Sequence, residues 1–218
     1  MFWPLIGRCV ALATAALVAG CATTIDGQPA TGEIRAISTG QPIATTTNTP
    51  VVTNTLPGPH PPPNSSNDGT TFDPCLAYSA EEIRAWGVNP TKVEDLGTKD
   101  PDLRGCIWSS GGADHWTVSQ LVINRQVSEY LDQRAYRGSR PIELGGLAGA
   151  VYYPLPGGHD ISCEVALPSQ HAVVSVGVMT FGIDAQKLIP DPCAKAIEVA
   201  TRVAPVLPQM DLGGDHGR

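Results

Sequence analysis

The stretch ISCEVALPSQHAVVSVGV, residues 161–178, decides the fold of this chain. Apolar side chains occupy every second position over 161–167, and again over 174–178, with the turn formers Pro-Ser-Gln at 168–170 between the two runs. A period of two predicts antiparallel strands with one covered face. Glu164 then points away from the covered face, where an exposed carboxylate is ordinary and a binding surface is the functional alternative.

The same period continues on both sides of this stretch. A strand that ends near Tyr153 leads through a Pro-Gly-Gly turn at 156–158 into the strand that begins near residue 159, so three strands in sequence form an antiparallel meander. Alternation over 116–122 predicts a further strand, and Cys106 and Trp108 lie on a short one. We expect the tryptophans to pack in the core, namely Trp86, Trp108 and Trp116.

Helix signals flank the strands. Two Asp-Pro-Cys triplets, at 73–75 and 191–193, each predict a helix start, because Asp accepts hydrogen bonds from first-turn amides and Pro suits the first helical position. Ser79 and Glu82 form a capping box after the first triplet. The predicted helices span residues 80–86, 126–136 and 191–204. The expected fold class is therefore α+β, a single domain in which helices pack on one or both faces of an antiparallel sheet.

The amino terminus has the pattern of a lipoprotein signal. Arg8 precedes an apolar run of about ten residues, which is too short to span a bilayer. Val18, Ala19, Gly20 and Cys21 match the bacterial lipobox, which implies cleavage before Cys21 and attachment of acyl chains such as palmitate to that cysteine. An ordinary signal peptide with a chance cysteine is the alternative. Two or more acyl chains hold a protein stably on a membrane.

Composition divides the chain into segments. Residues 22–70 contain no aromatic residue and no cysteine but many threonines and prolines, so they cannot bury enough apolar surface to fold. Such tracts carry O-linked sugar or serve as bare spacers, and both alternatives stay open. The expected organisation is a signal peptide at 1–20, a lipidated Cys21 with its tether over 21–71, a folded domain at 72–208, and a flexible tail at 209–218.

The domain contains four cysteines, Cys75, Cys106, Cys163 and Cys193, since Cys9 leaves with the signal. An even number in an exported domain predicts two disulfides. We favour the pairs Cys75 with Cys106 and Cys163 with Cys193, which are neighbours in sequence and join a helix start to a strand. Loop entropy does not decide the pairing, because longer loops would score slightly higher. A zinc site is the alternative, but the spacings lack C-x-x-C.

Four short motifs in this order carry a family resemblance: Phe72-Asp73-Pro74-Cys75, Gly105-Cys106-Ile107-Trp108, Cys163-Glu164-Val165 and Asp191-Pro192-Cys193. Together with the lipobox and the tether, they resemble the domain of unknown function in small actinobacterial lipoproteins of the LprB and LprC type. The resemblance covers residues 72–208. It implies a lipoprotein on the extracytoplasmic face of the cell membrane, with no catalytic residues to carry over.

The residues favour binding over catalysis. The chain has a formal charge of -7 and no basic stripe, which argues against nucleic acid as a partner. It contains no G-x-S-x-G, no H-E-x-x-H and no Walker lysine, so we predict no cofactor, no metal and no enzyme activity. We expect an interaction module for an envelope protein, lipid or glycan. The alternative is an envelope hydrolase that uses His159, Asp160 and Glu164.

Overall fold

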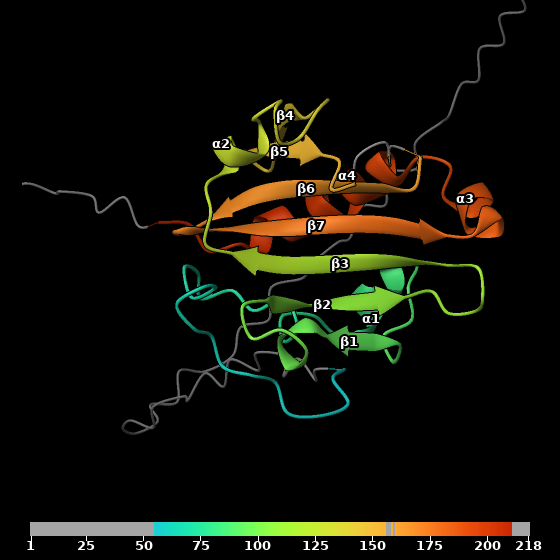
Figure 1. Ribbon diagram of the computed structural model, residues 1–218. Coiled ribbons are helices and arrows are strands. Elements are labelled where there is room, and N and C mark those ends of the chain that lie inside the picture. The colour runs from blue at the N-terminus through green and yellow to red at the C-terminus, as the bar shows by residue number, and fades with distance from the viewer. Residues whose placement is uncertain (1–54, 156–157, 159, 211–218) are drawn as a thin grey trace, which may run out of the picture. The chain divides into compact units, whose positions relative to one another are not determined.

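A computed structural model describes residues 55–155, 158 and 160–210, all within one compact unit that spans Asn48–Arg218. The signal, Cys21 and most of the predicted tether lie outside the described residues, as does the second unit, Met1–Thr47. The described chain forms one antiparallel seven-stranded sheet with strand order β1-β2-β3-β7-β6-β5-β4 (Figure 1). The strands are β1 Val93–Asp95, β2 Arg104–Ser109, β3 His115–Ile123, β4 Arg140–Leu144, β5 Leu147–Tyr152, β6 Ser162–Ser169 and β7 Ala172–Phe181.

The predicted meander is present. Strand β6 pairs with β5 on one side and with β7 on the other, and Val165 lies opposite Val151 and Val176 in these pairings. Side chains at alternate positions of β6, such as Cys163, Val165 and Leu167, are fully buried. The alternation read from the sequence therefore reports a covered face, and the α+β class is confirmed.

Helices lie on both faces of the sheet. Helices α1 (Ala80–Ala85) and α4 (Pro192–Val203) add Ile83, Val199 and Val203 to the main core, which also contains the buried Trp86, Trp108 and Trp116. Helix α2 (Val127–Tyr130) packs Tyr130 in a smaller cluster with Tyr152 of β5 on the opposite face. Helix α3 (Ile183–Leu188) follows β7. No helix in the described part of the chain has the length and apolar character needed to cross a bilayer.

Two of the three predicted helices, α1 and α4, begin where their capping residues predicted. The Ser79 hydroxyl and the Glu82 carboxylate form the expected capping box of α1, and Gly87 follows that helix with a positive φ of 93°. At α4, Asp191 Oδ1 accepts a hydrogen bond from the Ala194 amide at 2.9 Å. Both helix starts therefore follow from side-chain capping of free amides.

Two helix predictions were wrong. The expected helix over 126–136 ends at Tyr130, because Asp132 accepts a hydrogen bond from the Arg134 amide at 3.0 Å and turns the chain. The first Asp-Pro-Cys triplet starts a turn instead of a helix. Asp73 Oδ1 accepts from the Cys75 amide, two residues on, in the geometry of an Asx turn.

Two disulfides join the sheet to segments outside it. Cys75 pairs with Cys106 of β2, with a Cα–Cα distance of 5.3 Å, and Cys163 of β6 pairs with Cys193 of α4, at 4.9 Å. These are the pairs favoured from sequence proximity. The second bridge fixes the first turn of α4 against the central strands.

The segment 55–71 differs from the predicted tether because it contacts the domain. Thr70 Oγ1 and Ser169 Oγ lie 2.8 Å apart, and the buried guanidinium of Arg104 donates to the carbonyl oxygens of Thr70 and Phe72 at 2.8 Å each. Buried polar bonds hold this segment together with Leu56, which packs against the main core, and the low apolar content of the segment explains why its composition predicted a spacer. We call residues 55–71 the strap.

Candidate functional site

The sheet face that carries α2 has an open region formed by the middle strands. Strand register places Ile107, Ser119, Gly177 and Glu164 side by side in one row across β2, β3, β7 and β6. Neighbouring rows on the same face contain Leu121 and Met179. The row therefore contains a carboxylate, a hydroxyl and a glycine, and aliphatic side chains lie beside them.

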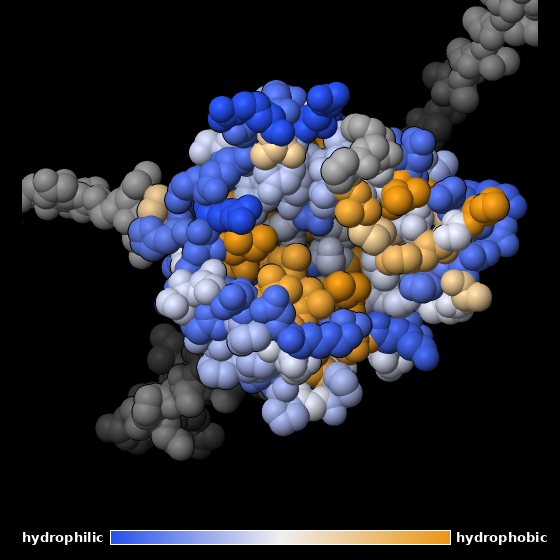
Figure 2. Space-filling view, viewed as in Figure 1, coloured by the Kyte–Doolittle hydropathy of each residue, from blue (hydrophilic) through white to orange (hydrophobic). Residues whose placement is uncertain are grey.

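A groove of about 630 Å³ follows this row. Figure 2 shows it as a hollow with hydrophobic side chains in its centre and polar residues around its rim. This volume falls within the range of about 300–1,000 Å³ that is typical of small-molecule sites. The apolar part of the lining comes from Val93, Ile107, Leu121, Val178, Met179 and Phe181, and the polar part includes Lys92, Glu94, His115, Ser119 and Glu164.

Gly177 forms the floor of the groove. A Cβ at this position would lie 2.5 Å from Ser119 Oγ and 3.0 Å from Glu164 Cγ, so these two side chains close over the space that glycine leaves. Ser119 and Glu164 can lie this close to each other because residue 177 has no side chain. Any larger residue there would have to displace both side chains into the groove.

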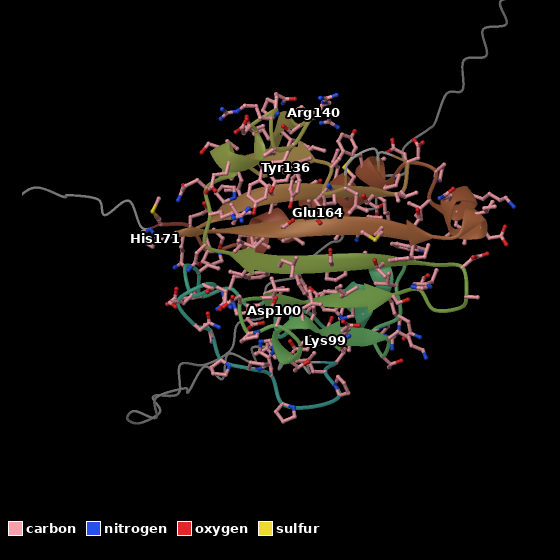
Figure 3. All side chains as sticks on the ribbon, in the orientation of Figure 1. Lys99, Asp100, Tyr136, Arg140, Glu164 and His171 are labelled. Atoms are coloured by element: carbon pink, nitrogen blue, oxygen red, sulfur yellow. A yellow bond between two sulfur atoms is a disulfide. The ribbon has the colours of Figure 1, made fainter. Side chains whose placement is uncertain are left out.

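Glu164 is held in place at the β6 side of the groove. Its Oε2 accepts a hydrogen bond from Ser175 Oγ at 2.5 Å and a second, short one from the Tyr152 hydroxyl. Burial raises the pKa of Tyr152 well above its usual value, and the Glu164 carboxylate raises it further, so the phenol keeps its proton and acts as donor. Figure 3 shows Glu164 over the centre of the sheet.

Aromatic residues line the groove at the end of β7, and others lie behind Glu164. His115 and Phe181 stack at the end of β7, with ring centroids 4.8 Å apart. Behind Glu164, the Tyr152 ring contacts Tyr130 and Tyr136 at centroid distances of 4.7 and 4.9 Å. Tyr130 and Tyr136 thus pack against Tyr152, whose hydroxyl bonds to Glu164.

A second polar cluster fastens the strap to the domain. His60 Nδ1 lies 2.7 Å from Asp95 Oδ2, and His60 Nε2 lies 2.8 Å from Asp73 Oδ2, so each carboxylate can accept a hydrogen bond from the ring. All three side chains are largely buried. Burial by itself would lower the pKa of His60, but the hydrogen bonds to Asp95 and Asp73 outweigh burial and raise it. The raised pKa favours the imidazolium form of His60 between the two carboxylates.

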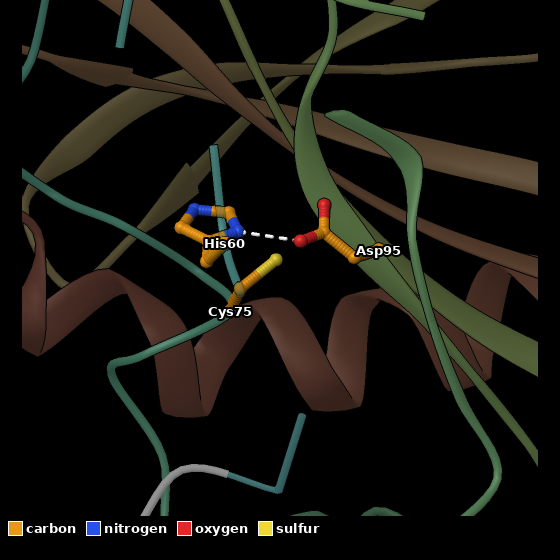
Figure 4. A group of neighbouring side chains, drawn as sticks. All are labelled: His60, Cys75 and Asp95. Carbon is orange, nitrogen blue, oxygen red and sulfur yellow. Dashed lines mark hydrogen bonds and ion pairs between the residues drawn. The ribbon is translucent and has the colours of Figure 1, made fainter. Parts of the chain in front are cut away.

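Side chains next to His60 are spaced like metal ligands, but they do not have the free donor atoms that a metal ion needs. His60, Cys75 and Asp95 bring potential ligand atoms within 4.8 Å of one another (Figure 4). Cys75 is bonded to Cys106, so it offers no thiolate, and both ring nitrogens of His60 already face carboxylates. We call His60, Asp73 and Asp95 the clasp, because the two carboxylates bracket the imidazole ring.

The clasp predicts a pH dependence of stability. Because the pKa of His60 is raised on folding, its stabilising effect is complete below the ordinary pKa of 6.5 and is lost as pH rises through the higher folded value. Between about pH 5.5 and about pH 9, the melting temperature of the wild type should fall more than that of His60→Gln. Differential scanning fluorimetry measures both curves. Parallel curves would contradict the ion-paired clasp, and His171→Gln, at an exposed position, is the matched control.

The structure places the other candidate residues as follows. Glu164 points to the open face as expected, whereas Asp160 is exposed and no described hydrogen bond or ion pair joins it to Glu164. His159 and Cys21 lie outside the described residues. The proposed trio of His159, Asp160 and Glu164 is therefore untested as a unit, and the partners that the structure does give Glu164 are Tyr152 and Ser175.

Sequence reasoning missed two features of these sites. His60 lies in the Thr/Pro-rich stretch and pairs with carboxylates 13 and 35 residues away, a separation that leaves no periodic signal. The groove depends on strand register, which brings Gly177 beside Ser119 and Glu164. The alternation indicated which face Glu164 occupies but not its neighbours across the sheet.

The family comparison agrees with the resemblance at its coarser level. A family model described as a protein of unknown function, DUF3558, matches residues 16–205. No curated protein and no solved structure matches the chain. The role of the protein therefore has to be inferred from its own residues.

Proposed function

Since the chain belongs to the DUF3558 family of proteins of unknown function, we propose its role from its own sites. It is a lipoprotein anchored through Cys21 to the extracytoplasmic face of the cell membrane, and its open groove binds a small amphipathic molecule. The lipobox at residues 18–21 supports the anchor. The motifs around the four domain cysteines support an actinobacterial lipoprotein of the LprB and LprC type.

One observation carries the binding role: a groove of about 630 Å³ with an apolar lining and a glycine floor. Ile107, Leu121 and Met179 form its aliphatic surface, and Ser119 and Glu164 supply polar atoms beside Gly177. An apolar cleft with a few fixed polar groups is the usual form of a small-molecule site. Two disulfides make the surrounding domain rigid, which lowers the entropic cost of binding.

Filling the groove tests this proposal. The full chain in phosphatidylcholine nanodiscs is titrated with phenylpropanol, a neutral amphipathic probe, by calorimetry, with empty nanodiscs as the blank. Gly177→Leu should weaken saturable binding at least about tenfold, because the new side chain displaces Ser119 and Glu164 and takes space at the centre of the groove. Gly58→Leu is the matched control, since nothing lies within 4 Å of a Cβ at that exposed position. Equal binding by the wild type and Gly177→Leu, or no saturable binding by the wild type, would contradict the proposal.

A further inference from the structure

We infer that Glu164 recognises a cationic nitrogen, so that the ligand of the groove is an amphipathic amine whose apolar body lies along β3 and β7. This inference rests on the proposed small-molecule role of the groove and names the class of its ligand. It follows from three observations: the unshared oxygen of Glu164, the arrangement of charges around the groove, and the composition of its walls.

The carboxylate of Glu164 presents one oxygen to a ligand. Both hydroxyl donors, Tyr152 and Ser175, bond to Oε2, and no described group donates to Oε1. A carboxylate oxygen accepts hydrogen bonds only, so its ligand counterpart must be a donor. The two hydroxyls also fix the side chain, so little conformational entropy is lost when a ligand binds.

The charges around the groove leave Glu164 without a cation. Within the described residues no basic side chain forms an ion pair with it, whereas Glu94, at the far side, pairs with Lys99 at 2.5 Å. Lys92 directly precedes β1. In the sheet, β1 lies four strand positions from β6, the strand of Glu164, which corresponds to about 19 Å between the two backbones. His115 is stacked on Phe181 at the end of β7. The chain as a whole has a formal charge of -7, which also attracts cations.

The walls of the groove suit an apolar body. Leu121 and Met179 lie on either side of the Ser119 and Gly177 row, and both line the groove, as does Ile107 of β2. Once a ligand covers the groove, water no longer solvates the Glu164 carboxylate, and the aliphatic side chains beside it offer no hydrogen bonds in exchange. A charged donor on the ligand therefore stabilises the complex more than a neutral donor does. Apolar contact and charge together define an amphipathic amine.

Three probes that differ only in their polar head test the inference: phenylpropylamine, phenylpropanol and phenylpropanoate. Each is titrated by calorimetry into the full chain in phosphatidylcholine nanodiscs, with empty nanodiscs as the blank. The wild type should bind the amine about tenfold to a hundredfold more tightly than the alcohol. The anionic probe should bind more weakly than either, because its charge has the same sign as that of Glu164.

Glu164→Gln is the decisive variant. Glutamine keeps an acceptor oxygen for Tyr152 and Ser175 but has no charge, so it should abolish the preference for the amine over the alcohol, which the ratio of the two affinities measures. Glu81→Gln, at an exposed position of α1 outside the groove, should preserve the preference for the amine. A wild type that binds the alcohol as tightly as the amine would overturn the inference but leave the binding role intact. If Gly177→Leu binds all probes like the wild type, the groove itself is wrong as the site.

Discussion

Replacement of both Cys163 and Cys193 by alanine should lower the free energy of unfolding by about 2–5 kcal/mol. The bridge closes a loop of 30 residues, for which the chain-entropy account gives about 3.6 kcal/mol. It also holds the first turn of α4 against β6, and both cysteines are buried there. A loss of this size is a large fraction of the roughly 5–15 kcal/mol that stabilises a typical domain.

Urea unfolding of the full chain, followed by tryptophan fluorescence, measures this loss. The wild type under reducing conditions should approach the stability of a variant that lacks both bridges, which separates the covalent effect from the loss of two sulfur atoms. Ala194→Ser, at the exposed position next to Cys193, is a control for local changes in α4. A double alanine variant within about 0.5 kcal/mol of the wild type would show that the bridge contributes nothing to stability.

Replacement of Cys21 by alanine should remove the whole lipid modification and, with it, stable attachment to the membrane. The physical reason is that attachment depends on two or more acyl chains, since one chain binds a bilayer only marginally. Intact-mass spectrometry detects the missing acyl groups, and fractionation detects an unprocessed or released protein. Lipid-modified, membrane-bound protein in the variant would refute the assignment of Cys21.

Cys9 provides the matched control for the anchor. It lies within the predicted signal peptide, ahead of the expected cleavage site, so Cys9→Ala should leave the lipidation of the mature protein unchanged. Equal loss of lipid in both variants would point to a general defect in export and not to the thiol of Cys21.

Local chemistry determined much of the fold from the sequence alone. The alternation over 161–178 predicted the antiparallel strands β6 and β7, because a period of two assigns each side chain to one face of the sheet. The capping residues Ser79 and Asp191 placed α1 and α4 because their side chains satisfy amides within three residues. The cysteine pairs also followed from proximity in sequence, since each closes the shorter available loop.

Contacts between distant segments required the tertiary structure. The composition of the strap predicted a spacer, and only folding brings His60 between Asp73 and Asp95, where buried polar contacts add to the packing of Leu56. Likewise, the alternation predicted which face of the sheet Glu164 occupies but not which residues lie beside it. The register of β6 with β7 and β5 decides that Gly177, Ser175 and Tyr152 surround it, because pairing between strands depends on the packing of the whole sheet.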